Sequence, residues 1–167
     1  MMDLNILSEA LHCLAAVTPL KTDCGEYCGA ACCKDNGEAG SGVWLLPGED
    51  DESPIAWAKL YLSKMPVCGE EVQTVYCLKP CQREARPVLC RIFPLSPYYS
   101  NKKQCWSVRM DRRAAAICPL YSWGKNGLSS EFVSAAERAV QLLSQDEDYL
   151  EVLKKLEAEE AAYRFEL

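Results

Sequence analysis

The chain has 167 residues, a length typical of one domain, and 49% of them are hydrophobic, enough for a buried core. Its formal net charge is −6, from 18 basic and 24 acidic residues, whereas nucleic-acid binders usually carry a basic face. No run of about 18 apolar residues marks a membrane span. We therefore expect a single domain over residues 1–167, with no nucleic acid and no membrane as partner.

The first 19 residues lack the features of a secretory signal. They carry Asp3 and Glu9, and they have neither a basic start nor an uninterrupted apolar stretch. We therefore expect a cytoplasmic protein, whose thiols stay reduced. Within this segment, leucines spaced three and four apart predict an amphipathic helix over residues 3–17, which Pro19 ends.

Residues 20–125 are rich in cysteine and proline and form the predicted metal-binding core. Residues 34–53 are glycine-rich and acidic, with a turn at 35–37, and we expect a mobile loop there. A short strand is predicted over 43–46, ended by Pro47-Gly48. Ser53 and Pro54 have the residue types of a helix N-cap and first helical position, so a helix is predicted from there to about Met65.

Strands are predicted over residues 72–77 and 105–110, and the prolines at 80, 87, 94, 97 and 119 favour irregular backbone between and after them. Residues 129–165 show helical periodicity. Ser144 with Glu147 fits a capping box, which predicts two helices with a break at 144–147; one bent helix is the alternative. The expected fold is mainly α with small irregular β elements (α+β), organised around a cysteine-ligated metal site.

The chain contains 11 cysteines, an odd number that cannot pair completely within one molecule. Most of them fall in two short stretches, CGEYCGAACC at 24–33 and CLKPCQREARPVLCR at 77–91. One more stands in the sequence ICPL. The predicted metal ligands are Cys24, Cys28, Cys32, Cys33, Cys77, Cys81, Cys90 and Cys118.

Clustered thiolates repel one another unless a cation neutralises them, so this density favours a metal ion or cluster. A tetrahedral zinc ion or an iron–sulfur cluster needs four ligands, commonly two from each of two segments. The adjacent Cys32 and Cys33 point in different directions. Either one ligates while the other packs, or the pair bridges a larger multinuclear centre. Simple burial and a disulfide framework are the alternatives for the whole set.

Three cysteines and the single histidine lie outside these stretches. Cys13, near the apolar stripe of its helix, and Cys105, in a strand beside Trp106, are expected to act as small buried hydrophobic residues. Cys68 precedes a glycine, and its role is left open. His12 is expected on a helix surface.

The two stretches resemble the YkgJ-like cysteine-cluster family, a family of zinc- or iron-chelating domains. The second stretch matches that family's pattern C-x4-R-P-x2-C-R-x-[FY]-P from Cys81 to Pro94, whereas in the first stretch the spacings from Cys24 to Cys28 and from Cys28 to Cys32 are each one residue longer. The resemblance covers roughly residues 24–94. It implies metal chelation and does not by itself imply a reaction.

Arg86 and Arg91 are the predicted cofactor-binding residues. A site with four thiolates carries a net charge of about −2, which guanidinium groups would offset while donating hydrogen bonds to sulfur. The alternative is that they pair with Glu84 or Glu70 on the surface.

Eight thiols slightly favour an iron–sulfur cluster over zinc, because the paired C-x2-C knuckles of a zinc ribbon are missing. The leading function is therefore metal or cluster binding. One alternative is a cluster-dependent enzyme similar to the flagellin lysine N-methylases, which carry a similar cysteine cluster. Another is a thiol redox or metal-trafficking protein. Because the chain lacks nucleotide-binding and hydrolase motifs, we lean against an enzyme.

Overall fold

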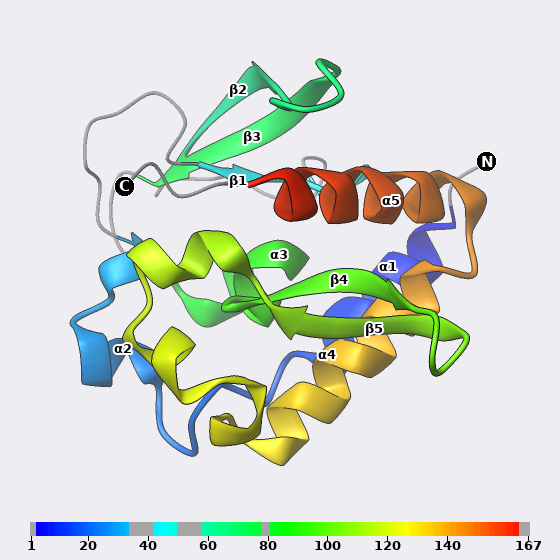
Figure 1. The fold of residues 1–167 in the computed structure, drawn as a ribbon. Coiled ribbons are helices and arrows are strands. Elements are labelled where there is room, and N and C mark those ends of the chain that lie inside the picture. The colour runs from blue at the N-terminus through cyan, green and yellow to red at the C-terminus, as the bar shows by residue number, and fades with distance from the viewer. Residues whose placement is uncertain (1–2, 34–41, 50–57, 78–80, 164–167) are drawn as a thin grey trace.

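The computed structural model describes residues 3–33, 42–49, 58–77 and 81–163 (Figure 1). The helices are α1 (Leu4–Cys13), α2 (Cys24–Cys28), α3 (Val88–Ile92), α4 (Ser130–Leu143) and α5 (Glu147–Ala162). The strands are β1 (Val43–Trp44), β2 (Ala58–Lys64), β3 (Glu71–Cys77), β4 (Leu95–Ser100) and β5 (Cys105–Met110). Short 3-10 turns span Ala31–Cys33, Arg83–Ala85, Arg112–Ala116, Pro119–Trp123 and Lys125–Gly127. The α+β prediction is confirmed.

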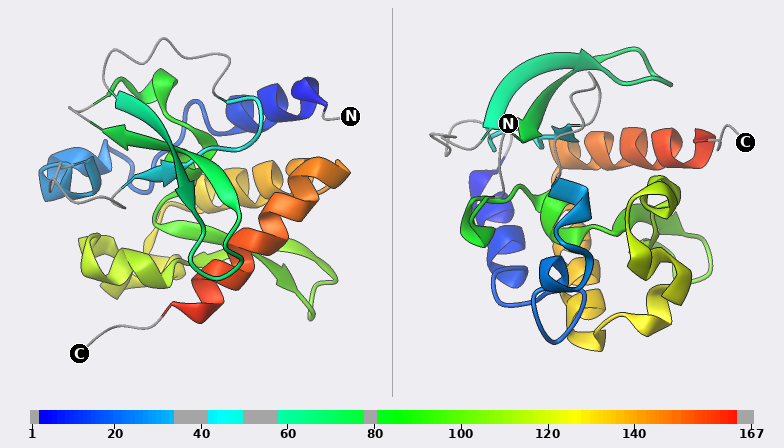
Figure 2. Two further views of the ribbon diagram at one scale, coloured as in Figure 1. Left: turned by 90° about the horizontal axis from the view of Figure 1, so that it is seen from above. Right: turned by 90° about the vertical axis from the view of Figure 1, so that its left-hand side faces the viewer.

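The strands form two separate antiparallel sheets. One has the order β1-β3-β2, and the other is the hairpin β4–β5. Helix α5 lies between the three-stranded sheet and the hairpin, as both views show (Figures 1 and 2). Helix α4 packs against β5, and α1 packs against α4. No helix in the described ranges is long and apolar enough to cross a membrane.

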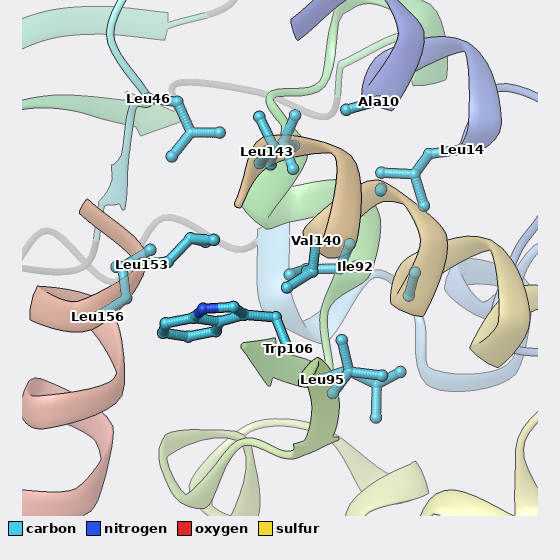
Figure 3. Packing of buried hydrophobic residues seen from close by; sticks show 14 of the residues in the cluster. Ala10, Leu14, Leu46, Ile92, Leu95, Trp106, Val140, Leu143, Leu153 and Leu156 are labelled. Atoms are coloured by element: carbon cyan, nitrogen blue, oxygen red, sulfur yellow. The ribbon is translucent and has the colours of Figure 1, made fainter. Parts of the chain in front are cut away.

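The hydrophobic core lies where α1, α3, α4 and α5 meet the hairpin (Figure 3). The apolar stripe predicted for residues 132–143 faces this core: Phe132 and Ala136 are fully buried, and Val140 and Leu143 are 1% exposed. Trp106 of β5 contributes the largest apolar side chain of the hairpin to the cluster. This packing holds the two C-terminal helices against the hairpin. The hairpin itself directly follows the second cysteine stretch in the chain.

The predicted break between the C-terminal helices is confirmed, but its capping residue is different. Helix α5 is capped by Asp146, whose carboxylate accepts hydrogen bonds from the N–H groups of Asp148 and Tyr149 at 2.9 and 3.3 Å. Ser144 instead ends α4, and its hydroxyl donates to the carbonyl of Gln141. An aspartate directly before a helix is as good an N-cap as serine, and Asp146 takes this role in place of the predicted Ser144.

Residues 58–64 form a strand, which contradicts the helix predicted from Ser53 to Met65. All seven residues of β2 pair with β3, from Ala58 opposite Cys77 to Lys64 opposite Glu71. Pairing with a neighbouring strand overrides a weak local helix preference. The proposed cap at Ser53 and Pro54 lies outside the described residues, as do the turn at 35–37 and most of the predicted mobile loop at 34–53.

Three further boundaries differ from the sequence-based expectations. Helix α1 ends at Cys13, with Leu14 as its C-cap, rather than continuing to residue 17. The short strand at 43–46 is limited to Val43 and Trp44. Strand β4 contains Pro97, where irregular backbone was expected. Proline is tolerated there because a two-stranded sheet has only edge strands, so its missing N–H can face away from the partner strand.

Two buried glutamates fix α5 to the rest of the molecule. Glu159 accepts hydrogen bonds from the N–H groups of Val67 and Cys68, in the turn between β2 and β3, at 2.6 and 3.1 Å. Glu160 is fully buried and forms ion pairs with Arg109 and Arg112. The backbone N–H of Arg112 also donates to Glu160 at 3.1 Å. The end of α5 is therefore tied both to the three-stranded sheet and to the end of β5.

Replacing Glu160 by glutamine should lower the free energy of unfolding by about 1–3 kcal/mol, because Arg109 and Arg112 lose their shared anion. Urea unfolding followed by circular dichroism measures this loss. Glu151→Gln is the matched control: Glu151 is 67% exposed and pairs with Lys155 at the surface, where an ion pair contributes little. Equal unfolding midpoints for the two variants would contradict the assigned role of Glu160.

Candidate metal centre

The first cysteine stretch folds as one helical turn followed by a reversal. The carboxylate of Asp23 accepts a hydrogen bond from the N–H of Gly25 at 3.0 Å and so begins α2. Gly29 ends the helix in the left-handed conformation, with φ of 63°, which glycine adopts without steric cost. Ala30 follows with φ of 54°. These two residues turn the chain into the 3-10 turn that carries Cys32 and Cys33.

The second stretch brings its cysteines from three different elements. Cys77 ends β3, Cys81 precedes the 3-10 turn at Arg83–Ala85, and Cys90 lies in the short helix α3. Pro87 directly precedes α3 in extended conformation, with φ of −61° and ψ of 162°. The last predicted ligand, Cys118, directly precedes the turn that begins at Pro119.

Five of the eight predicted ligands line one cavity of about 40 Å³. They are Cys24, Cys28 and Cys32 of the first stretch, Cys90 of the second, and Cys118. The remaining lining residues are Pro19, Arg83, Arg86, Arg91, Phe93, Pro94 and Leu120. The cavity is larger than the roughly 10–15 Å³ that one water molecule needs. The fold therefore brings together, around a small cavity, cysteines up to 94 positions apart in the chain (118 − 24).

Cys90 interacts electrostatically with the other three predicted ligands, Cys33, Cys77 and Cys81. Cys77 in turn interacts with Cys33 and Cys81. All eight predicted ligands thus belong to one connected group of interacting thiols.

Within residues 3–33, 42–49, 58–77 and 81–163, no three or more His, Cys, Asp or Glu side chains are arranged as a metal-ion site. The thiols are close enough to interact, but they do not point at a common centre. Ligation of one metal ion by several of them therefore requires rotation about their Cα–Cβ bonds.

Most of these thiols resist ionisation in the metal-free state. Burial raises the pKa of Cys24, Cys90 and Cys118, and neighbouring cysteines raise each of them further. Burial, with the nearby Cys33 and Cys81, raises the pKa of Cys77 to about 11. Bringing several thiolates together in a partly desolvated site is costly unless a cation balances them. A metal cation would supply that balance.

The adjacent Cys32 and Cys33 behave differently. Their sulfur atoms lie 3.8 Å apart, so the expectation that the two side chains point in different directions is wrong. A hydrogen bond from Cys32, opposed by burial and assisted by Arg86, lowers the pKa of Cys33 to about 6. The same hydrogen bond raises the pKa of Cys32. The lowered pKa of Cys33 and the raised pKa of Cys32 favour a pair that holds one thiolate and one thiol.

The two predicted cofactor-binding arginines have different surroundings. Arg86 donates a hydrogen bond to Cys81; burial alone would lower the pKa of Arg86, but this bond and nearby cysteines raise it. Arg91 is 9% exposed, and its guanidinium donates to the backbone carbonyls of Leu11, Glu84 and Arg86. Arg91 therefore joins α1 to the segment before α3, although it also lines the cavity. Whether either contacts a cofactor stays a prediction.

Sequence reasoning missed Arg83, which also lines the cavity. Burial and the neighbouring Arg86 both lower the pKa of Arg83. The available signal was its spacing: Arg83 stands three residues before Arg86, so a helical turn brings the two side chains to one side.

The residues set aside from the ligand pool lie elsewhere. Cys13 packs against the hydrophobic core, and Cys105 begins β5 beside Gln141. Cys68 is exposed in the turn between β2 and β3, and His12 is exposed on α1. None of these four residues, all of which the structure describes, lines the cavity.

Comparison of the chain with protein-family models, with curated proteins and with solved structures found no match. The resemblance to the YkgJ-like family therefore stays a prediction, based on the spacing of the cysteines and on the Arg86–Pro94 segment.

The residue types at the cavity suit a metal ion or cluster with thiolate ligands, although in the described residues their side chains are not arranged around one ion. Soft sulfur donors select zinc or iron–sulfur clusters, and the cavity supplies them from both cysteine stretches. Arg86, already hydrogen-bonded to a cysteine, provides positive charge and a donor to sulfur beside them.

In the metal-free protein, Cys33 should react first with a maleimide at pH 7, because the thiolate is the nucleophile. Its rate should fall as the pH is lowered through about 6. Replacing Cys32 by alanine removes the hydrogen bond that stabilises the thiolate, so it should slow the reaction at pH 6–7. Peptide mass spectrometry after brief labelling identifies the modified residue.

Cys32→Ser is the control for that experiment, because its hydroxyl can still donate to the sulfur of Cys33. Cys68, which is exposed and outside the cavity, provides an internal reference rate. Labelling of Cys68 ahead of Cys33 at pH 7 would contradict the lowered pKa.

Proposed function

We propose that the protein binds a metal ion or an iron–sulfur cluster through cysteine thiolates from two segments of the chain. The observation that carries this proposal is the shared cavity: Cys24, Cys28 and Cys32 meet Cys90 and Cys118 there. Random burial of cysteines would not place thiols from such distant positions around one small space. The YkgJ-like resemblance of the same residues supports the proposal.

We further propose that the eight cysteines divide into two sets of four. Cys24, Cys28 and Cys118 line the cavity together with Cys32, and these four form the first set. Cys33, Cys77, Cys81 and Cys90 form the second. Mutual electrostatic interactions among the second four support this grouping. Each set has the four ligands that a tetrahedral zinc ion or a cubane cluster needs.

This division gives the adjacent cysteines distinct roles. Cys32 interacts with Cys24 of the first set and also with Cys90 of the second, whereas Cys33 interacts with Cys77 and Cys90 of the second. Because their sulfur atoms lie only 3.8 Å apart, the two adjacent residues would then link two neighbouring centres rather than compete for one. Because Cys90 lines the cavity of the first set as well, the two centres would be adjacent.

When bound, an iron–sulfur cluster would supply one-electron redox chemistry, and zinc would supply a structural cross-link. The number of thiols favours the cluster. The cysteines would hold the group, Arg86 would offset the negative charge of the thiolates, and Arg91 would keep α1 against the segment that precedes α3. Ligation would stabilise the fold by about 10 kcal/mol, as structural zinc sites do. A cytoplasmic location, where thiols stay reduced, is part of this proposal.

A thiol redox or metal-trafficking role is a second candidate, favoured by the vicinal pair Cys32 and Cys33. Cys32 is exposed, and Cys33 ionises near neutral pH. An accessible thiolate is what metal uptake or thiol exchange needs. The methyltransferase alternative stays a prediction.

Anaerobically purified protein should contain zinc or iron with sulfide at one or two centres per chain, and an iron–sulfur form should be brown. Elemental analysis and an absorption spectrum measure this. Cys90→Ser should lower the metal content, because Cys90 lies where the two sets meet. Cys105→Ser is the matched control, since Cys105 is also half-buried but lies outside the cavity. Substoichiometric metal together with 11 free thiols would refute the proposal.

A further inference from the structure

Arg83 presents a pair of hydrogen-bond donors for which the described part of the chain offers no acceptor. Its Nε and Nη2 atoms are buried, and neither has a hydrogen-bond partner among the described residues. These two N–H groups lie on the same edge of the planar guanidinium and point in parallel, the arrangement that binds two oxygens of one anion. The Nε atom of Arg86 is buried and unpaired as well. Both arginines line the cavity described above.

Arg113 shows how a carboxylate can fill such an edge in this protein. Its Nε donates to Oδ1 of Asp111 at 2.9 Å, and its Nη2 donates to Oδ2 at 2.6 Å. The same two atoms that are unpaired in Arg83 are therefore satisfied in Arg113 by a carboxylate. Arg91, beside the cavity, is satisfied by three backbone carbonyls instead. Among the described residues, the Nε–Nη2 edge of Arg83 has neither kind of hydrogen-bond acceptor, although the charges of Asp23 and Glu84 act on it.

Unpaired buried donors are costly, and those on a charged group cost more than neutral ones. Here three such donors belong to two cations that line one cavity and repel each other. An anion between them would satisfy the donors and relieve the repulsion. Because the Nε–Nη2 edge offers two parallel bonds, its best acceptor has two coplanar oxygens, which a thiolate or sulfide does not.

We propose that Arg83 and Arg86 bind a small oxyanion, the carboxylate or phosphate group of a ligand, in the cavity beside the cysteines. At about 40 Å³ the cavity admits a small anionic group and not a whole nucleotide. The site goes beyond metal binding, because its donors belong to arginine and are present without a metal. A metal held by the cysteines and an anion held by Arg83 would occupy neighbouring parts of one cavity.

The test titrates inorganic phosphate and, separately, acetate into the full-length, anaerobically purified protein, with calorimetry at two sodium chloride concentrations. At least one anion should bind with a stoichiometry near one; phosphate alone identifies a phosphate site, and acetate identifies a carboxylate site. Arg83→Lys keeps the charge but loses the paired donors, so it should weaken binding by about tenfold or more. Arg138→Lys, an exposed arginine on α4, should leave binding unchanged.

A second measurement uses the wild-type protein and does not depend on the folding of a variant. The Nε–Hε resonance of Arg83 in a nitrogen-15 spectrum should shift on addition of the bound anion, while that of Arg113, already paired, should not. Binding of neither anion, equal binding by Arg83→Lys, or a shift of Arg113 alone would overturn the proposal. Metal content, measured on the same samples, reports separately on the cysteine site.

Discussion

Thiols that are crowded into a partly desolvated space cannot all ionise, and this constraint governs the cysteine-rich part of the molecule. Each thiolate raises the free energy of the next, and burial adds to the cost. Cys90, Cys24 and Cys77 all have raised pKa values for these two reasons. Such a cluster is stable as neutral thiols or around a cation. The elements around the cysteines, here called the frame, suit the second of these states, in which a cation would balance the thiolates.

The frame has two parts that meet at the cavity. Arg91 joins α1 to the segment before α3, which fixes Cys90 relative to the N-terminal helix. The carboxylate of Glu49 accepts hydrogen bonds from the N–H groups of Leu46 and Val88, so it connects the segment after β1 to the start of α3. Figure 1 shows α2 and the turns of residues 112–127 at the same end of the molecule. Cysteines from separate segments are thereby presented to one space.

Sequence patterns predicted the parts of this fold that depend on local periodicity. Strand β5 and the two C-terminal helices follow from their alternating or helical spacing of apolar residues. The prediction failed at residues 58–64, where pairing with β3 decides the structure, and such pairing is not visible in a short segment. It also missed β4, because Pro97 suggested irregular backbone and only the two-stranded sheet makes it acceptable.

The site was predictable to a similar extent. Spacing alone singled out the eight cysteines, since no ordinary helix or strand needs thiols at that density. Their approach to one another in space depends on how the segments pack, so the sequence left the grouping open. Arg83 was missed because its significance lies in missing partners, which only a folded structure reveals. Arg91, predicted to bind a cofactor, lines the cavity and also donates to three backbone carbonyls, so its cofactor role stays a prediction.

X-ray absorption at the metal edge of the anaerobically purified protein tests the central claim most directly, because it reports the atoms bound to the metal. The account predicts a first shell of sulfur at about 2.3 Å. A second metal scatterer would indicate an iron–sulfur cluster. A first shell made only of nitrogen or oxygen at about 2.0–2.2 Å, or the absence of any bound metal, would contradict the assignment of these cysteines as ligands.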